Sequence, residues 1–414
     1  MKSSRIKTVR SLRPVAGRGT LGPLRPGLLR EANAWEILRL VRQHAPCSRA
    51  DLVRYSGLSA PTVSSAIEYL RRQRLVEPLG LGASSGGRPP GLLRFNSGYG
   101  YVVGADIGGT RVRVALADME GRILGKWAAS TRSQRTPVGI VGLIRRGLRE
   151  LQRQHKVPTE KLLALAAGAP GVTDARAGIV FSAPHLSKWH NVPLRQLLQA
   201  KVKLPTAVEN DVNLGALGEA WCGAAREVQN FVFLAIGTGI GAGIFLNGRL
   251  YHGSDWAAGE VGYMHVPGTP ASPLAMDRPG ALESVIGGHG VERAWQSRQN
   301  GRTASAPPHA LRATEIFDQA QAGHPVARSI LQNTSRILAD AIVNISVMLN
   351  PSLVVFGGGI GSSVPLFETT RRILGRNEFA RPRLAISLLG PDAQLFGAVR
   401  LALDLAEERL MAGH

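Results

Sequence analysis

Cysteine is scarce in this chain of 414 residues, which has only Cys47 and Cys222. Their wide separation gives neither a metal-ligand spacing nor the disulfide framework of a small secreted domain. Long hydrophobic runs are also lacking. None approaches the roughly 18 residues that a membrane span requires, and no apolar segment of the kind found in signal peptides follows the basic N-terminus. We therefore expect a reduced, cytoplasmic protein without a membrane segment.

Acidic residues are rare in the first quarter of the chain. Residues 1–98 hold 17 Lys/Arg against 5 Asp/Glu, whereas residues 99–414 hold 33 against 24, within a total net charge of +21. Residues 1–27 contain no acidic residue and are expected to form a basic disordered tail that adds unspecific phosphate contacts. This asymmetry is an electrostatic footprint for nucleic acid, although a solvated basic face would give the same composition.

Residues 48–75 have the pattern of two short helices joined by a tight turn. Ser48 and Asp51 have the spacing of a capping box, Gly57 supplies the turn, and Ser59 is a good N-cap for the second helix. That helix, expected over Ala60 to Arg72, buries one stripe of apolar residues and exposes a small, polar and then basic face. Such a face favours entry into the DNA major groove over the alternative, a helical hairpin in another kind of domain.

The residues around this helix pair complete the pattern of a winged helix-turn-helix over residues 28–83. A helix is expected from Arg30 to Gln43, and two strands are expected at 75–79 and 92–95, with a glycine- and proline-rich wing and linker at 84–98. We expect base contacts from the start of the recognition helix and phosphate contacts from its end. The first set is Ala60, Pro61, Thr62, Ser64 and Ser65, and the second is Arg71, Arg72 and Arg74.

Arg88 stands at the tip of the expected wing, between Gly87 and Pro89. An arginine held extended by a following proline fits a narrow, A/T-rich minor groove, where the negative potential is concentrated. The alternative is an ordinary linker with one solvated arginine. We include Arg88 among the expected DNA-binding residues.

Three glycine-rich loops follow apolar strands in the rest of the chain. Glycine-rich turns offer backbone amides to phosphate, and a carboxylate at a strand end can hold Mg²⁺ through water. A single loop of this kind is equally compatible with a simple hairpin turn, but three predict two α/β lobes that close on a nucleotide-type cleft. The expected phosphate-binding residues are Asp106, Gly108, Gly109, Thr110, Gly237, Thr238, Gly239, Gly358 and Gly359.

The chain after about residue 28 resembles the ROK family (repressors, open reading frames and sugar kinases), and in particular its transcriptional regulators. The resemblance rests on SRADLVRYSGLSAPTVSSAIEYL and GGRPPGLLRFN in the N-terminal part, and on DIGGT, GAPGV, ENDVNLGALGE, GTGIGAGIFLNGRLYHG and AAGEVG in the remainder. It implies an actin/hexokinase-like α/β fold over residues 99–414. The two lobes, about 99–212 plus the C-terminal helix and about 213–390, would hold a sugar between them.

The same resemblance implies the roles of individual residues. Asn210-Asp211 match the Asn-Asp pair of the family, in whose kinases the aspartate takes the proton from the sugar 6-hydroxyl. Glu260 and Glu283 match the sugar-contacting glutamates, although a surface turn is the alternative for Glu260. Gly171, with Gly168 and Pro170, would shape the loop under the sugar.

The chain departs from the family at its zinc site. The family commonly has one histidine and three cysteines there, and those positions fall on Tyr263, Leu274, Met276 and Ala281. None of these side chains ligates zinc in the usual way, so we expect no structural zinc. The missing histidine also touches the sugar in the family, and Tyr263 is therefore the expected sugar contact at that position.

Two functions remain open at this point. The first is a DNA-binding regulator, expected to be a repressor of carbohydrate-utilisation genes, whose cleft senses a sugar or sugar phosphate and needs no cofactor. It would act as a homodimer or homotetramer on double-stranded DNA with an inverted-repeat operator. The second is a sugar kinase with a DNA-binding appendage, which would need ATP and Mg²⁺ and would use Asp211 as its catalytic base. The complete winged helix favours the first.

Overall fold

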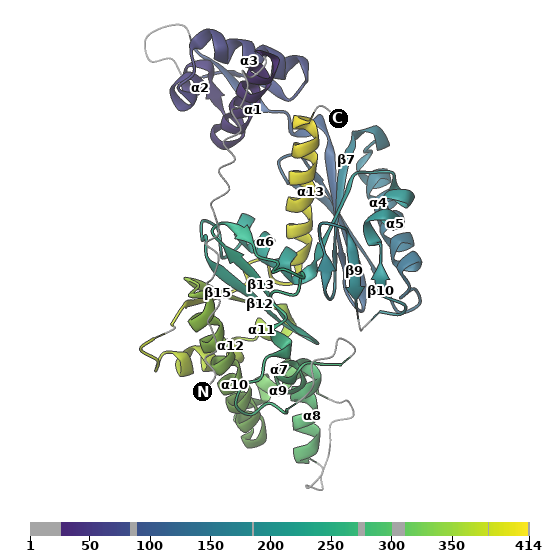
Figure 1. The fold of residues 1–414 in the computed structure, drawn as a ribbon, viewed down its shortest axis with the longest axis vertical. Coiled ribbons are helices and arrows are strands. Elements are labelled where there is room, and N and C mark those ends of the chain that lie inside the picture. Colours follow the sequence, from purple (N-terminus) through teal and green to yellow (C-terminus); the bar gives the residue numbers. More distant parts are fainter. Residues whose placement is uncertain are drawn as a thin grey trace, which may run out of the picture. The chain divides into compact units, whose positions relative to one another are not determined.

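The computed structural model describes residues 26–82, 89–183, 186–271, 278–299, 311–379 and 381–412. It divides the chain into two compact units that meet in the sequence between Asn96 and Ser97 (Figure 1). Within the described ranges, no helix combines the length and apolar character needed to cross a bilayer.

The first unit is a winged helix-turn-helix, as the sequence predicts. Three helices are followed by the two strands of the wing, and a short strand before the second helix adds a third member to the sheet, in the order β1-β3-β2. The elements are α1 (Pro26–His44), β1 (Cys47–Ser48), α2 (Arg49–Ser56), α3 (Ala60–Arg72), β2 (Val76–Leu81) and β3 (Gly91–Phe95).

Local signals in the sequence set the ends of α2 and α3. Ser48 and Asp51 form the expected capping box, in which Asp51 N donates to Ser48 Oγ (3.2 Å) and Ser48 N donates to Asp51 Oδ2 (2.9 Å). Gly57 ends α2 in the left-handed region at φ 67°, and Ser59 caps α3. The predicted stripe of α3 is confirmed, because Val63, Ile67 and Leu70 are fully buried.

The second unit is built on two five-stranded sheets with the same topology. In each sheet an antiparallel three-stranded meander is extended by two parallel strands beside its first strand. The first sheet has β4 (Tyr101–Ile107), β5 (Arg111–Asp118), β6 (Ile123–Ser130), β7 (Leu162–Ala169) and β11 (Thr206–Asn210). The second has β12 (Phe231–Ile236), β13 (Ile240–Leu246), β14 (Arg249–Leu250), β15 (Leu353–Gly357) and β16 (Arg383–Ile386).

Helices cover both faces of each sheet, and a small sheet is inserted in the first lobe between β7 and α5. The first sheet packs on α4 (Pro137–His155) and α5 (Leu194–Val202). The small sheet consists of β8 (Thr173–Asp174), β9 (Ile179–Ser182) and β10 (His190–Val192), in the order β10-β9-β8. The second five-stranded sheet packs on a larger helical layer (Figure 1). That layer consists of α7 (Ala281–Ile286), α8 (Gly288–Gln299), α9 (Ala313–Gln321), α10 (Pro325–Leu349), α11 (Gly358–Gly361) and α12 (Val364–Leu374).

Two helices pack together where the lobes of the second unit join. They are α6 (Asp211–Cys222), which follows the last strand of the first sheet, and α13 (Ala393–Met411) near the C-terminus. Their backbones approach so closely that a Cβ added to Gly397 would overlap Leu214 O, and one added to Gly218 would overlap Ala393 O. Any larger residue at either position would therefore push the helices apart. This close crossing fixes α6 and α13 against each other where the two lobes join.

Candidate functional site: a recognition helix and a group of carboxylates

The outward face of α3 carries the residues predicted to contact DNA. Ala60, Pro61 and Ser65 are exposed, and Thr62 and Ser64 are partly buried at its edges. Thr62 Oγ1 is 2.8 Å from Ser59 Oγ and is therefore already hydrogen-bonded within the cap. The face is small and polar over its first two turns, so a duplex can approach it closely.

The basic residues after this face differ in how they are held. All three of Arg71, Arg72 and Arg74 are exposed. Arg71 lies 3.2 Å from Glu68, which also pairs with Arg49 of α2 at 2.8 Å, so this carboxylate joins the two helices. Arg74 adopts a left-handed backbone at φ 59°, and its carbonyl accepts from the Asn96 side chain (2.9 Å). Arg88, predicted at the wing tip, lies outside the described residues.

The three glycine loops occupy the ends of strands. Gly108, Gly109 and Thr110 make the turn between β4 and β5, and Gly237 to Gly239 make the matching turn between β12 and β13 in the second sheet. Gly358 and Gly359 begin α11 directly after β15. Gly108 N and Gly237 N are used within their own turns, where they donate to Arg111 O and Gly239 O, both at 2.9 Å. Any phosphate contact must therefore come from the neighbouring amides.

Asp106, at the end of β4, is a buried carboxylate with a fixed partner. Arg113 on the neighbouring strand approaches it to 2.8 Å and also reaches Asp392 at 3.2 Å, just before α13. Burial raises the pKa of Asp106, and Arg113 opposes that effect. Neither Arg113 nor Asp392 was predicted from the sequence, because a partly buried arginine in a strand shows no pattern of its own until its partners in the fold are known.

Asn210 and Asp211 lie at the junction of β11 and α6. The Asn210 side chain caps α6, accepting from Val212 N and Asn213 N, and donates to Gly171 O at 3.0 Å. Gly171 has φ 81°, and an added Cβ would overlap Ser182 O, so only glycine fits there.

Asp211 is the first residue of α6. Burial, followed by the nearby charges of Asp106 and Glu260, raises its pKa to about 8.

Glu260 and Glu283 extend this group of carboxylates into the second lobe. Burial, and then the charge of Glu283, raises the pKa of Glu260. Glu283 in α7 accepts from Ile240 N at 3.0 Å, beside the turn made by Gly237 to Gly239. Tyr263 is half-buried, and its hydroxyl donates to Arg278 O at 3.4 Å. The structure thus brings acids from both lobes together, a donor and acceptor set that suits sugar hydroxyls.

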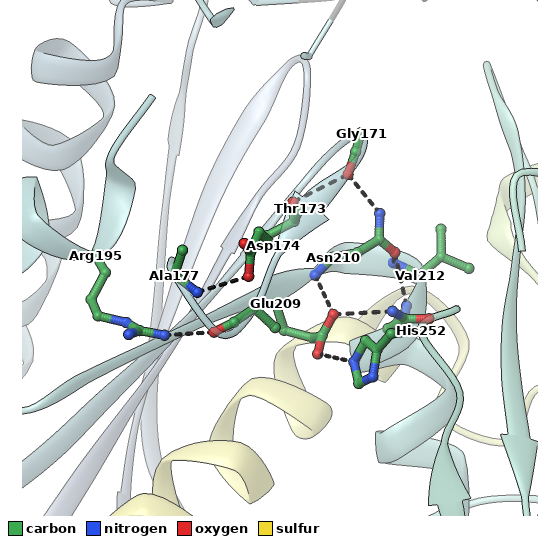
Figure 2. A network of polar contacts seen from close by, with 11 residues as sticks. Gly171, Thr173, Asp174, Ala177, Arg195, Glu209, Asn210, Val212 and His252 are labelled. Atoms are coloured by element: carbon green, nitrogen blue, oxygen red, sulfur yellow. Dashed lines mark hydrogen bonds and ion pairs between the residues drawn. The ribbon is translucent and has the colours of Figure 1, made fainter. Parts of the chain in front are cut away.

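A buried network behind Asn210 was not predicted, although its residues lie inside the motifs noted above. Figure 2 shows Glu209 directly before Asn210, with its carboxylate bonded to three groups. It accepts from Asn210 N (2.7 Å) and the Asn213 side chain (3.0 Å), and His252 Nε2 lies 2.7 Å from its other oxygen. His252 comes from the loop after β14, so this contact joins the two lobes directly behind the acids. A carboxylate at a buried strand position was the signal that could have found it.

The Glu209–His252 pair makes a testable contribution to stability. The hydrogen bond to Glu209 raises the pKa of His252. This contribution is therefore fully present below the unfolded value near 6.5 and is lost as pH rises through the raised value. We expect His252→Gln to lower the melting temperature by roughly 3 °C at acidic pH and by less above neutrality. Thermal denaturation of the wild type and the variant, from acidic pH to above neutrality, measures the difference between their melting temperatures. His289→Gln, on the exposed start of α8, is the control. A melting-temperature difference that does not depend on pH would contradict a stabilising pair between Glu209 and protonated His252.

The side chains around the carboxylates limit which metal ion the site can hold. In the portions of the chain that the structure covers, no three His, Cys, Asp or Glu side chains are grouped to hold a metal ion by themselves. Of the four positions that replace the zinc ligands, Tyr263 and Ala281 are described and neither is a metal ligand, whereas Leu274 and Met276 lie outside the described residues. Mg²⁺ is usually held by one or two carboxylates together with substrate phosphates. Asp106, two residues before Gly108 of the first glycine turn, fits that requirement.

The fold defines the class of this protein: a two-lobed, actin/hexokinase-like domain that follows a winged helix-turn-helix. A model of the ROK family matches residues 102–405, and a model of the MarR family matches residues 27–80. The chain therefore belongs to the ROK family.

Curated relatives include both regulators and kinases. A xylose repressor of Caldicellulosiruptor bescii is 27% identical over 395 residues, covering 91% of this chain and 96% of the repressor. A glucokinase of Halalkalibacterium halodurans is 30% identical over 311 residues, covering 72% of this chain and 93% of the kinase. Among solved structures, a ROK family transcriptional regulator, a homologue of the E. coli MLC protein, superposes with a TM-score of 0.78. It is 23% identical, and the superposition covers 93% of this chain and 98% of that one.

Proposed function

We propose that this protein is a sugar-responsive transcriptional repressor. The observation that carries the proposal is the presence, in one chain, of a winged helix-turn-helix and of a ROK domain in which carboxylates from both lobes lie near one another. A xylose repressor aligns over 91% of the chain, whereas the glucokinase aligns over 72% of it. A kinase has no need of the recognition face on α3.

The proposed mechanism couples the two units through the lobes of the cleft. Two subunits place their α3 helices in successive major grooves of an inverted repeat, with Arg71, Arg72 and Arg74 on phosphates and Arg88 in the minor groove. A sugar is held by Asn210, Asp211, Glu260 and Glu283, with Tyr263 beside them. It prefers one arrangement of the lobes while the operator prefers the other. Sugar and operator then weaken each other by the same factor.

The test is a titration of operator binding with sugars. The operator is obtained by selecting random duplexes against the wild-type protein, and xylose, aldohexoses and amino sugars are then added. We expect one sugar to raise the melting temperature and to change operator affinity at least roughly 10-fold. Glu283→Gln should keep operator binding but lose most of the response to sugar. A sugar that binds the cleft without changing operator affinity would contradict the proposal.

Phosphorylation of the sugar is a second candidate, favoured by one observation. Asp211 lies among the acids, and the glycine turns of both sheets retain the positions that the family's kinases use. If the kinase is active, Asp106 would hold Mg²⁺ with the nucleotide phosphates, and the metal would offset the charge of those phosphates. Asp211 would accept the proton from the sugar hydroxyl, while Asn210 and Gly171 would hold its backbone in place.

A further inference from the structure

The positive charge of the second unit is concentrated in one segment. Residues 99–414 carry an excess of nine Lys/Arg over Asp/Glu, and residues 122–156 alone contain nine Lys/Arg against one acid, Glu150. This segment covers β6 and α4 (Figure 1). The remainder of the unit is therefore almost neutral, and the cationic excess belongs to one surface rather than to the domain as a whole.

Helix α4 gathers part of this charge on a single face. Its apolar residues, among them Ile144, Leu148 and Leu151, are buried against the first sheet. The opposite face carries four arginines, which we call the arginine stripe: Arg145, Arg146, Arg149 and Arg153. Along the axis they extend over about 12 Å, because each residue of an α-helix rises about 1.5 Å.

A shallow groove of about 1050 Å³ runs past the stripe. Small residues, Ala128, Ala129 and Gly142, line part of it, and Lys201 of α5 adds a fifth cation. Trp127 of β6 also lines the groove, and Arg146 lies over its ring at 5.5 Å. Small lining residues between long cationic side chains leave room for a broad anionic surface rather than for one enclosed small ligand.

Most of this charge has no counter-ion within the described part of the protein. Arg153 pairs with Glu150 at 2.6 Å, but no carboxylate lies within ion-pair distance of Arg145, Arg146 or Arg149 in the ranges described. Arginines four residues apart on one helix repel each other. The free protein bears this repulsion, and a bound polyanion would relieve it.

We infer that the arginine stripe is a second DNA-binding surface, which contacts the phosphates of duplex DNA. Lys/Arg gathered along one helix face are the electrostatic footprint of a nucleic-acid-binding surface, and the planar arginine fork suits phosphate oxygens. The winged helix already holds DNA in the proposed function, so a duplex is the polyanion present at the highest effective concentration. The inference goes beyond that function, which assigns DNA contacts to the first unit alone.

The experiment measures the salt dependence of DNA binding by the full-length protein. The probe is a fluorescent duplex of about 40 base pairs of random sequence, titrated between about 50 and 200 mM salt. The stripe variant, Arg145→Gln/Arg146→Gln/Arg149→Gln, should bind at least roughly 10-fold more weakly at the lowest salt. For this variant, the slope of the logarithm of the binding constant against the logarithm of the salt concentration should be shallower by about 0.9 for each phosphate that is no longer neutralised. Lysine at the same three positions should keep most of the slope, which separates loss of charge from loss of folding.

A matched control removes the same charge elsewhere in the same unit. Arg371→Gln/Arg372→Gln/Arg376→Gln changes exposed arginines in the last turn of α12 and just after it, and should leave the slope close to that of the wild type. If the DNA affinity of the stripe variant and of this control depended on salt in the same way, the inference would be overturned. That result is expected if the stripe binds an acidic protein instead of DNA. A third variant, Arg71→Gln/Arg72→Gln/Arg74→Gln, tests the winged helix separately. If it bound as the wild type does, the proposed function would fail without affecting the result for the stripe.

Discussion

Ser65→Glu is expected to weaken operator binding roughly 100-fold, because it places a negative charge where the recognition helix meets the DNA phosphates and base edges. Ser65 is exposed on the outward face of α3, and the buried stripe of that helix lies on the other side. The substitution therefore changes the surface without disturbing the packing. Fluorescence anisotropy with the selected operator measures the loss.

Two controls separate this effect from a general effect of charge. Ser65→Ala keeps the helix small at the same position and should bind within a few-fold of the wild type. Ser297→Glu puts the same charge on an exposed position of α8 in the second unit and should have no effect on the operator. Equal losses for Ser65→Glu and Ser297→Glu would show that α3 is not the recognition helix.

Asp211→Asn is expected to abolish any phosphoryl transfer to sugar while making the protein more stable at high pH. Loss of a general base typically costs roughly 10² to 10⁴ in rate. In the wild type the pKa of Asp211 is raised to about 8, whereas an unfolded aspartate ionises near 3.9. Between these values the folded state keeps a proton that the unfolded state has lost, so wild-type stability falls as pH rises. Asparagine does not titrate and avoids this loss.

Melting temperatures measured from about pH 5 to pH 9 test the second half of this prediction. The advantage of Asp211→Asn should grow up to about pH 8, reach roughly 5 °C or more, and then stay constant. A difference that does not change with pH would mean that Asp211 is already ionised in the folded protein. Turnover with ATP and Mg²⁺ by the wild type, lost in the variant, would establish the kinase. No turnover in either protein would leave the cleft as a sensor.

Local signals in the sequence were sufficient for the helix-turn-helix and for the positions of the glycine turns. The capping box at Ser48, the turn at Gly57 and the apolar stripe of α3 are short-range patterns, and the structure has all three. The glycine turns after β4 and β12 were also predictable, because each follows an apolar strand directly. The phosphate, sugar and DNA roles of the residues in these elements remain predictions that the variants above would test.

The tertiary structure alone decided which distant side chains meet. Glu209 and His252 are 43 residues apart, yet they form one pair because β11 and the loop after β14 come together behind Asn210. Arg113 joins Asp106 to Asp392 only because α13 returns to the first sheet from the end of the chain. The composition of residues 122–156 showed a cationic segment, but the burial of the other side of α4 placed its arginines on one face. Local sequence sets helices, turns and caps through neighbouring residues, whereas pairing, burial and the resulting pKa shifts depend on contacts that exist only in the folded chain.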